Sequence, residues 1–226
     1  RCLEPWERAL IRSTWQEHDF GLAAMVMLYT GFRRGEMLHL NIDRDVDFEK
    51  KTIAVRGAVS FSEGNRPKLT KGKTASAIRT VPLLPPLEEA LKGRHGLVCH
   101  KENGGIMSQS AFACKYESYI TFLETKLNGI HKRWYGKTNE QKQLLAEGKL
   151  PPWKEINIRC HDFRVEFCTR AYYAQVPLKT LQSWMGHADA DMILAIYTKL
   201  DKEQERTDAA KMVNYLTRLE VDSAAE

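Results

Sequence analysis

The chain has 226 residues, of which 43% are hydrophobic and 28% are charged, with a formal net charge of +5. This length and composition fit one globular unit with its own core, alone or with a tail, and they exclude a short peptide, a fibre and a disordered tail. No apolar run approaches the ~18 residues of a membrane span, so we expect no membrane partner. The small positive excess identifies no partner unless it is concentrated in particular segments.

The cysteines are odd in number and show no Cys-x-x-Cys spacing, which indicates reduced thiols in a cytoplasmic protein. We expect all five to be buried small apolar residues: Cys2, Cys99, Cys114, Cys160 and Cys168. The first six residues lack the basic start and apolar stretch of a signal peptide. Because the chain does not begin with Met, we expect it to be a fragment of a longer protein.

Helical periodicity dominates the opening. It predicts helices at Pro5–Trp15 and Phe20–Thr30, and Gly31 ends the second of them before a third at Arg34–Leu40. A short β region follows within Val46–Val55, and a further strand is expected at Ile78–Leu83.

The polar stretch Gly57–Ala77 has the length of an extended hairpin tip, and such tips on small sheets often carry function. After Pro85-Pro86 we expect helices at Leu87–Lys92, Ser108–Leu127, His161–Ala174, Leu178–Met185 and Asp191–Leu200. The polar segment Asn128–Ile158 is expected to be a surface insertion. The predicted fold class is mainly α with a small antiparallel β-sheet (α+β).

The positive charge is unevenly distributed. Ser62–Thr80 has five basic residues against Glu63 alone, and Thr121–Cys160 has eight basic against four acidic residues, so each segment carries +4. From Leu200 onward seven acidic residues face four basic ones, which gives −3. The hairpin is typical of a loop that tracks phosphates, whereas the insertion is equally explained as a solvated face. The candidates for contact with a phosphate backbone are Arg66, Lys68, Lys71 and Arg79.

Two motifs in the first half of the chain carry side chains suited to binding a phosphate. The turn Thr30-Gly31-Phe32 delivers Arg33 to the start of a helix, where free N–H groups favour an anion. Glu36 lies on the same helical face and could orient that guanidinium. Further on, Lys73 lies at the hairpin tip just before a strand.

Two more motifs lie in the second half. His161 and Arg164 are three residues apart on one helical face and can address one phosphate together. Gly186-His187 is followed ten residues later by Tyr197 on a predicted helix. Taken singly, each of the four motifs is more often structural than catalytic.

The order of these motifs resembles the catalytic domain of the tyrosine recombinase (phage integrase) family of DNA breaking-rejoining enzymes. The resemblance runs from about Trp6 to Leu200. Three motifs are most similar to integrases of prophages and integrative conjugative elements: Thr-Gly-x-Arg-x-x-Glu, Lys-Thr-x-Ser-x-Arg-x-Val-Pro and Trp-Met-Gly-His…Ile-Tyr-Thr. Val165 follows Arg164 where many members have another His.

The resemblance implies a catalytic domain at 1–200 with its insertion at 128–158, a C-terminal tail at 201–226, and N-terminal core-binding or arm-binding domains outside this fragment. It also implies that Tyr197 attacks a DNA phosphodiester and forms a 3′-phosphotyrosine. The remaining implied catalytic residues are Arg33, Lys73, His161, Arg164 and His187, with Glu36 in support. No cofactor is implied, and no metal is expected, because His95, Cys99 and His100 lack a fourth ligand at finger spacing.

The partners implied are double-stranded DNA, as attachment or core sites and Holliday junctions, and further copies of the chain in a tetrameric synapse on DNA. Lys211–Leu219 suits an amphipathic helix that docks onto a neighbouring protomer or folds back on its own core, and the sequence favours neither. Two alternatives stay open. One is a chromosome-dimer resolvase or type IB topoisomerase with the same chemistry, and the other is a non-catalytic DNA-binding protein on this scaffold.

Overall fold

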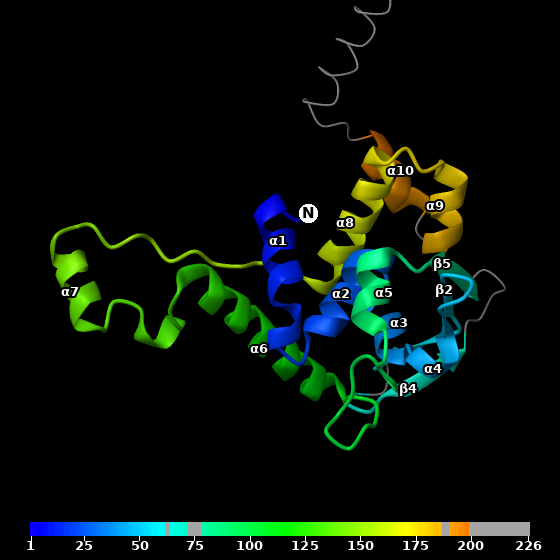
Figure 1. Ribbon diagram of the computed structural model, residues 1–226, viewed down its shortest axis with the longest axis horizontal. Coiled ribbons are helices and arrows are strands. Elements are labelled where there is room, and N and C mark those ends of the chain that lie inside the picture. Colours follow the sequence, from blue (N-terminus) through cyan, green and yellow to red (C-terminus); the bar gives the residue numbers. More distant parts are fainter. Residues whose placement is uncertain (62–63, 72–77, 187–189, 199–226) are drawn as a thin grey trace, which may run out of the picture.

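The computed structural model describes residues 1–61, 64–71, 78–186 and 190–198. Up to Asp45, the elements of the chain are all helical (Figure 1). Its elements in chain order are α1 (Pro5–Thr14), the 3-10 turn η1 (Trp15–Glu17), α2 (Gly21–Thr30), α3 (Arg34–His39) and α4 (Ile42–Asp45). The three helices expected from periodicity are confirmed, and the single turn α4 was not predicted.

Helix α2 forms the centre of the core. All its residues but Leu22 are buried, and it packs against α1, α3, α5 and α8. A helix that is apolar on every side is expected to be buried on every side. The run from Leu22 to Tyr29 is apolar in this way, which explains the central position of α2. It ends at Gly31, whose φ of 65° lies in the left-handed region and whose N–H donates to the Met27 carbonyl. A Cβ at Gly31 would lie 2.8 Å from the Phe167 ring, so the turn also requires glycine for space.

The strands form two small antiparallel sheets rather than one. The first has the order β1-β2-β5, from β1 (Val46–Asp47), β2 (Thr52–Val55) and β5 (Arg79–Pro82). The buried pair Ile53 and Val81 lie opposite each other in it. The second sheet pairs β3 (Gly57–Ser60) with β4 (Lys68–Lys71), within the stretch predicted to be a hairpin tip. The α+β class is therefore confirmed.

The remaining elements are α5 (Pro85–Leu91), α6 (Gln109–Asn128), the 3-10 turn η3 (Lys132–Trp134), α7 (Asn139–Ala146), α8 (Cys160–Tyr173), α9 (Leu178–Met185) and α10 (Ala190–Thr198). Helices α8, α9 and α10 gather on one side of the body (Figure 1). Helix α8 joins two hydrophobic clusters, because Phe163 belongs to the large core around α2 while Phe167 packs with Leu181 of α9 and Ile193 of α10. Within the described ranges, no helix has both the length and the apolar character needed to cross a membrane.

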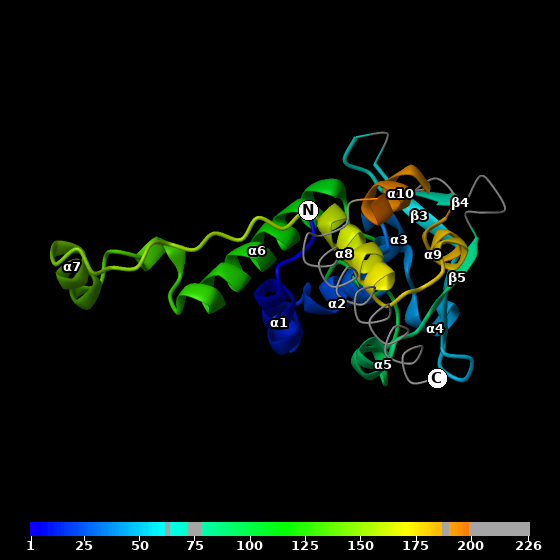
Figure 2. The same ribbon diagram turned by 90° about the horizontal axis from the view of Figure 1, so that it is seen from above.

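Residues 129–155 form an arm that leaves the body at the end of α6 and returns to the start of α8. Figures 1 and 2 both place α7 at its far end. The base is fastened by Asn128, whose side chain donates to the Lys154 carbonyl (2.9 Å) and accepts from the Lys154 N–H (3.0 Å). Most of the segment predicted to be a surface insertion lies in this arm. Ile156 and Ile158, which the predicted segment included, are instead buried, since the returning segment packs on α6.

The expectation that all five cysteines are buried is also wrong. Cys99 and Cys168 are buried, Cys2 and Cys160 are half-buried, and Cys114 is exposed on the outer side of α6. Burial raises the pKa of the Cys2, Cys99 and Cys160 thiols to about 11. The prediction failed for Cys114 because this residue lies on the solvent-exposed side of α6.

Gly35 lets α3 lie directly on β3, and its replacement by alanine tests that contact. An added Cβ would lie 2.4 Å from the Val59 carbonyl oxygen, so backbone would have to move. We expect Gly35→Ala to lower the free energy of unfolding by about 1–3 kcal/mol, less any gain in helix propensity, measured by urea denaturation. Gly105→Ala is the matched control, because its nearest neighbour is the end of the Asn103 side chain at 3.1 Å. Equal stability of the two variants would contradict the close packing of α3.

Candidate active site

An open pocket of about 520 Å³ lies between the start of α3, the first half of α6 and the start of α8. Its wall is strongly basic, with four arginines and one histidine against a single acid, Glu117. Such a wall favours an anion. The lining residues are Arg33, Arg34, Phe112, Ala113, Tyr116, Glu117, Arg159, Cys160, His161 and Arg164.

Arg33 reaches the pocket from the turn between α2 and α3. The Thr30 hydroxyl fixes this turn, because it donates to the Val26 carbonyl (2.6 Å) and accepts from the Phe32 N–H (3.1 Å). Arg33 is the N-cap residue of α3, and its own N–H donates to Glu36 Oε2 (3.0 Å). Its side chain is 43% exposed, with Nη1 3.5 Å from Glu36 Oε1. The predicted position of Arg33 at the start of a helix is confirmed.

Arg164 lies beneath the pocket and is fully buried. Its Nη1 donates to the Gly31 carbonyl (2.5 Å) and its Nη2 to the Met185 carbonyl (2.6 Å). Those two carbonyls end α2 and α9, so one guanidinium from α8 holds the ends of two other helices. His161, one turn earlier on α8, is exposed and lines the same pocket. His161 and Arg164 therefore line one pocket, and that they address one phosphate together stays a prediction.

Glu36 is the buried carboxylate of the site, and its main partner is Arg79. Two parallel hydrogen bonds join them, from Arg79 Nη1 to Oε1 (3.0 Å) and from Nη2 to Oε2 (2.8 Å). Arg164 Nη1 lies 3.9 Å from Glu36 Oε2. Burial by itself would raise the pKa of Glu36, but the hydrogen bonds and charge of Arg79, with the charge of Arg164, bring it below its ordinary value.

The structure contradicts the expectation that Arg79 contacts a DNA backbone. Its side chain is 6% exposed, it pairs with Glu36, and its Nε donates to the Trp184 carbonyl (2.5 Å). A guanidinium engaged on both sides inside the protein is not presented to a ligand. Arg79 instead ties β5 to α3 and to the end of α9, and Glu36 orients Arg79 more than it orients Arg33.

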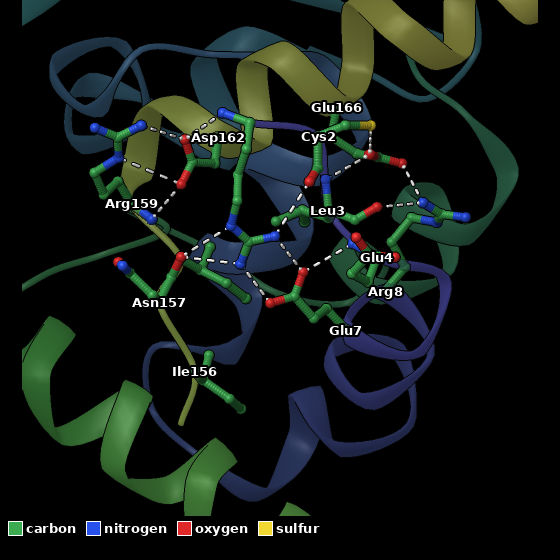
Figure 3. Close-up of polar contacts among 12 residues, drawn as sticks. Cys2, Leu3, Glu4, Glu7, Arg8, Ile156, Asn157, Arg159, Asp162 and Glu166 are labelled. Atoms are coloured by element: carbon green, nitrogen blue, oxygen red, sulfur yellow. Dashed lines mark hydrogen bonds and ion pairs between the residues drawn. The ribbon is translucent and has the colours of Figure 1, made fainter. Parts of the chain in front are cut away.

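The start of α8 is anchored from behind by the first residues of the chain (Figure 3). Asp162 accepts hydrogen bonds from the Arg159 N–H (2.9 Å) and guanidinium (3.1 Å). Burial would raise the pKa of Asp162, and these hydrogen bonds lower it below its ordinary value. Glu166, fully buried, accepts from the Leu3 N–H (3.1 Å) and the Cys2 thiol (2.6 Å), while Arg8 pairs with it at 3.1 Å.

Three of the six predicted catalytic residues cannot be placed in this pocket. Lys73 and His187 lie outside the described residues, as does the side chain of Tyr197. The backbone of Tyr197 belongs to α10, which packs against α8 and α9. Of the remaining backbone-contact candidates, Arg66 and Lys68 are exposed on the β3–β4 hairpin, and Lys71 has its backbone in β4 but its side chain outside the described set.

Sequence reasoning missed two lining arginines. Arg34 directly follows Arg33 in the motif, and Arg159 stands three residues before Asp162, a spacing that indicates a reciprocal helix cap. The metal candidates do not converge: the His95 imidazole pairs with Asp43 (2.6 Å), whereas that of His100 contacts the Lys101 carbonyl (2.7 Å). Over the described ranges, no three His, Cys, Asp or Glu residues gather as ligands would.

Comparison with known proteins agrees with this arrangement. Residues 13–204 match the model of the family described as the phage integrase family. The chain belongs to the phage integrase family. The resemblance drawn from the motifs and the fold expected from it are therefore confirmed.

The relatives of this integrase-family chain are recombinases and transposases. It is 27% identical over 221 residues to a tyrosine recombinase XerC-like protein of Caldanaerobacter subterraneus subsp. tengcongensis, which covers 91% of this chain and 52% of the relative. It is 29% identical to the prophage integrase IntR of Escherichia coli strain K12, over 75% of this chain and 40% of that protein. The chain thus spans about half the length, or less, of these curated relatives.

Solved structures share the fold. The Tn1549 transposon integrase in complex with circular intermediate DNA has a TM-score of 0.64 and 25% identity, covering 94% of this chain and 67% of that one. XerA recombinase has a TM-score of 0.56 and 20% identity, over 94% and 65% of the two chains, and supports the fold alone.

Replacing the buried carboxylate tests the Glu36 network. Glu36→Gln leaves Arg79 and Arg164 without their counter-charge, so we expect it to lower the free energy of unfolding near neutral pH by about 3–5 kcal/mol, measured by urea denaturation. The folded-state pKa of Glu36 is below its ordinary value of 4.5, so its contribution is present above the unfolded-state pKa and is lost as the pH falls through the folded-state value. The difference between wild type and variant should therefore shrink in acid.

The control is Glu88→Gln, which removes a surface ion pair with Lys51. We expect a loss of less than about 1 kcal/mol there. A loss for Glu36→Gln that is as small as this, or that does not change with pH, would contradict the buried network.

Proposed function

We propose that this chain is the catalytic domain of a site-specific DNA recombinase, an integrase that cleaves and rejoins double-stranded DNA through a 3′-phosphotyrosine and thereby integrates or excises a mobile element. The observation that carries the proposal is the meeting of Arg33, His161 and Arg164 in one basic pocket. These residues are far apart in the sequence, and the helix that holds Tyr197 packs on the helix that holds the last two. Family membership supports the same reaction class.

The two arginines have different parts in the proposed mechanism. The exposed fork of Arg33 binds the nonbridging oxygens of the scissile phosphate, whose charge grows in the phosphorane-like transition state. Arg164 is held in place by two backbone carbonyls and contributes a fixed positive charge from a fully buried side chain. A charge that is already oriented needs no reorganisation during reaction, and at low dielectric it acts more strongly than in water.

The remaining groups attack the phosphate, transfer protons or position the phosphate. The Tyr197 hydroxyl attacks phosphorus, and His161 accepts its proton or holds it in line. Lys73 delivers a proton to the leaving 5′-oxygen, and His187 positions the phosphate. Tyrosine at its reference pKa of about 10 is a poor nucleophile at neutral pH, so a cationic pocket helps by favouring the phenolate. The phosphotyrosine conserves the phosphodiester bond energy, so religation requires neither ATP nor a metal in this scheme.

Duplex DNA is the proposed substrate. Arg66 and Lys68 are exposed on the β3–β4 hairpin, and the hairpin meets the start of α6, where the Ser110 N–H donates to the Asn65 side chain (2.8 Å). A basic hairpin fastened beside a basic pocket suits contact with consecutive backbone phosphates. Binding should therefore weaken steeply as salt rises.

A chromosome-dimer resolvase is the second candidate, with the same chemistry and a different biological role. The XerC-like relative is described as a tyrosine recombinase, which is compatible with this candidate. The prophage integrase and the transposase from transposon Tn916 of Enterococcus faecalis, 28% identical over 76% of this chain and 40% of that protein, favour the mobile element. The residues within the three sequence motifs also favour the integrase of a mobile element.

Covalent capture tests the enzymatic proposal. The protein is incubated with fragmented genomic DNA of its source organism, denatured, and the DNA that remains attached is sequenced to obtain the cleaved site. On a suicide duplex of that sequence we expect a covalent protein–DNA species with wild type and none with Tyr197→Phe, because the phenylalanine has no nucleophilic oxygen. A well-folded wild type that captures no DNA would refute the proposal.

The proposed tetramer on DNA is tested at the tail. Lys211–Leu219 lies outside the described residues, and we propose that it docks onto a neighbouring protomer. Deleting Glu203–Glu226 should then leave binding of one half-site unchanged and abolish the tetrameric complex, measured by sedimentation of the protein with the captured duplex. Unimpaired tetramer assembly by the truncated chain would exclude docking in trans.

A further inference from the structure

Two arginines that line the pocket, Arg34 and Arg159, have no part in the proposed mechanism. Arg34 is exposed, lines the pocket beside Arg33, and places its guanidinium over two aromatic rings. The guanidinium carbon lies 5.3 Å from the centroid of Phe61 and 5.5 Å from that of Phe112. Both distances are within the ~6 Å range of a cation–π contact.

The other arginines around the pocket already have acidic partners. Arg159 pairs with Asp162 at 3.1 Å, Arg79 pairs with Glu36, and Arg33 also contacts Glu36. Arg34, in contrast, makes no hydrogen bond or ion pair within the part of the chain that the structure describes. Its five N–H donors are therefore open to a ligand, and a planar fork matches the oxygens of a phosphate.

The two rings hold this fork in a defined direction. Phe61 follows β3, and Phe112 belongs to α6, so two separate elements support one guanidinium. Phe112 is itself buried, and Gly35 keeps α3 close to β3, which fixes the distance between Arg34 and the hairpin. Contact with aromatic faces limits the motion of a long side chain before it binds, so less conformational entropy is lost on binding.

We propose that Arg34 binds the DNA phosphate next to the one that is cleaved, so that consecutive arginines hold consecutive phosphates of one strand. This rests on the proposed function. Arg33 points toward Glu36 in the interior, whereas Arg34 points toward Phe61 and Phe112, so the two side chains diverge from neighbouring Cα atoms. A pocket of about 520 Å³ has room for more than one phosphate, since one water molecule occupies about 30 Å³.

The direction of the Arg34 side chain also indicates the path of the cleaved DNA strand. The side chain lies on the side of the pocket formed by α6 and the β3–β4 hairpin, and Arg66 and Lys68 are exposed further along that hairpin. The strand would therefore leave the cleaved phosphate at Arg33, cross Arg34 and continue along the hairpin. Glu117, the single acid in the pocket wall, makes no ion pair with Arg34.

The experiment removes, one at a time, the two opposite charges of the proposed contact: the Arg34 guanidinium of the protein and a backbone phosphate of the DNA. Covalent adduct formation is timed on the captured suicide duplex and on two copies of it with an uncharged methylphosphonate, one on the 5′ side of the cleaved phosphate and one on the 3′ side. We expect Arg34→Ala to slow the reaction on unmodified DNA by about tenfold or more, as loss of a charge-assisted contact does. One of the two methylphosphonate duplexes should slow the wild type by about the same factor as the Arg34→Ala substitution does. The Arg34→Ala variant should react on that duplex less than about twofold more slowly than it reacts on unmodified DNA.

The opposing result is equally clear. If both methylphosphonates slow Arg34→Ala by the same factor as they slow wild type, or if Arg34→Ala reacts at the wild-type rate, Arg34 binds no neighbouring phosphate and only joins the hairpin to α6. Arg34→Gln, which keeps the stem packed on the rings, repeats the test if the alanine variant does not fold. Arg94→Ala, which removes another ring-stacked arginine over Trp15 outside this pocket, should match wild type on all three duplexes.

Failure of this inference is distinguishable from failure of the proposed function. Adduct formation by wild type on unmodified DNA, and its loss in Tyr197→Phe, test the reaction itself. The response to the methylphosphonates tests Arg34 alone.

Discussion

The site depends on one buried carboxylate held between two buried guanidiniums. Glu36 accepts hydrogen bonds from both terminal nitrogens of Arg79, and its Oε2 lies 3.9 Å from Arg164 Nη1. An ionised carboxylate in the interior is costly unless it is paired, and each of these arginines is equally costly without it. The three charges therefore require one another, and they fix α3, β5 and α8 relative to one another. The arginines continue this connection to the carbonyls of Trp184 and Met185 at the end of α9.

This network explains why the pocket is rigid where the proposed chemistry needs it. Arg33 is set by the α2–α3 turn and by Glu36, and Arg164 by the ends of α2 and α9. On its other side, α8 is held by Leu3 and Arg8 through Glu166. Charge pairs and hydrogen bonds therefore hold α8 on both sides. His161 lies in the first turn of this helix, which has little freedom to shift.

The sequence was most informative where a local rule decides the structure. The apolar run of α2, the glycine stop at Gly31 and the alternation of β2 follow from period and backbone geometry, so the fold class was predictable. The motif order identified the family, and three of the residues that the resemblance implies as catalytic, Arg33, His161 and Arg164, line one pocket. Arg79 was misassigned because its charge and its place in a basic hairpin look the same whether the side chain meets DNA or a buried glutamate.

By itself the sequence determined most of the helices, the short strands, the family and the candidate residues, because each depends on neighbours in the chain. Only the tertiary structure decided which charges are buried and which are presented. Arg79 and Arg164 are buried, and Arg164 contributes to the pocket from within the protein, whereas Arg33 and Arg34 are exposed at the pocket, although all four are the same residue type. The difference arises from partners that are distant in sequence: Glu36 encloses Arg79, and Phe61 and Phe112 hold Arg34 in the open.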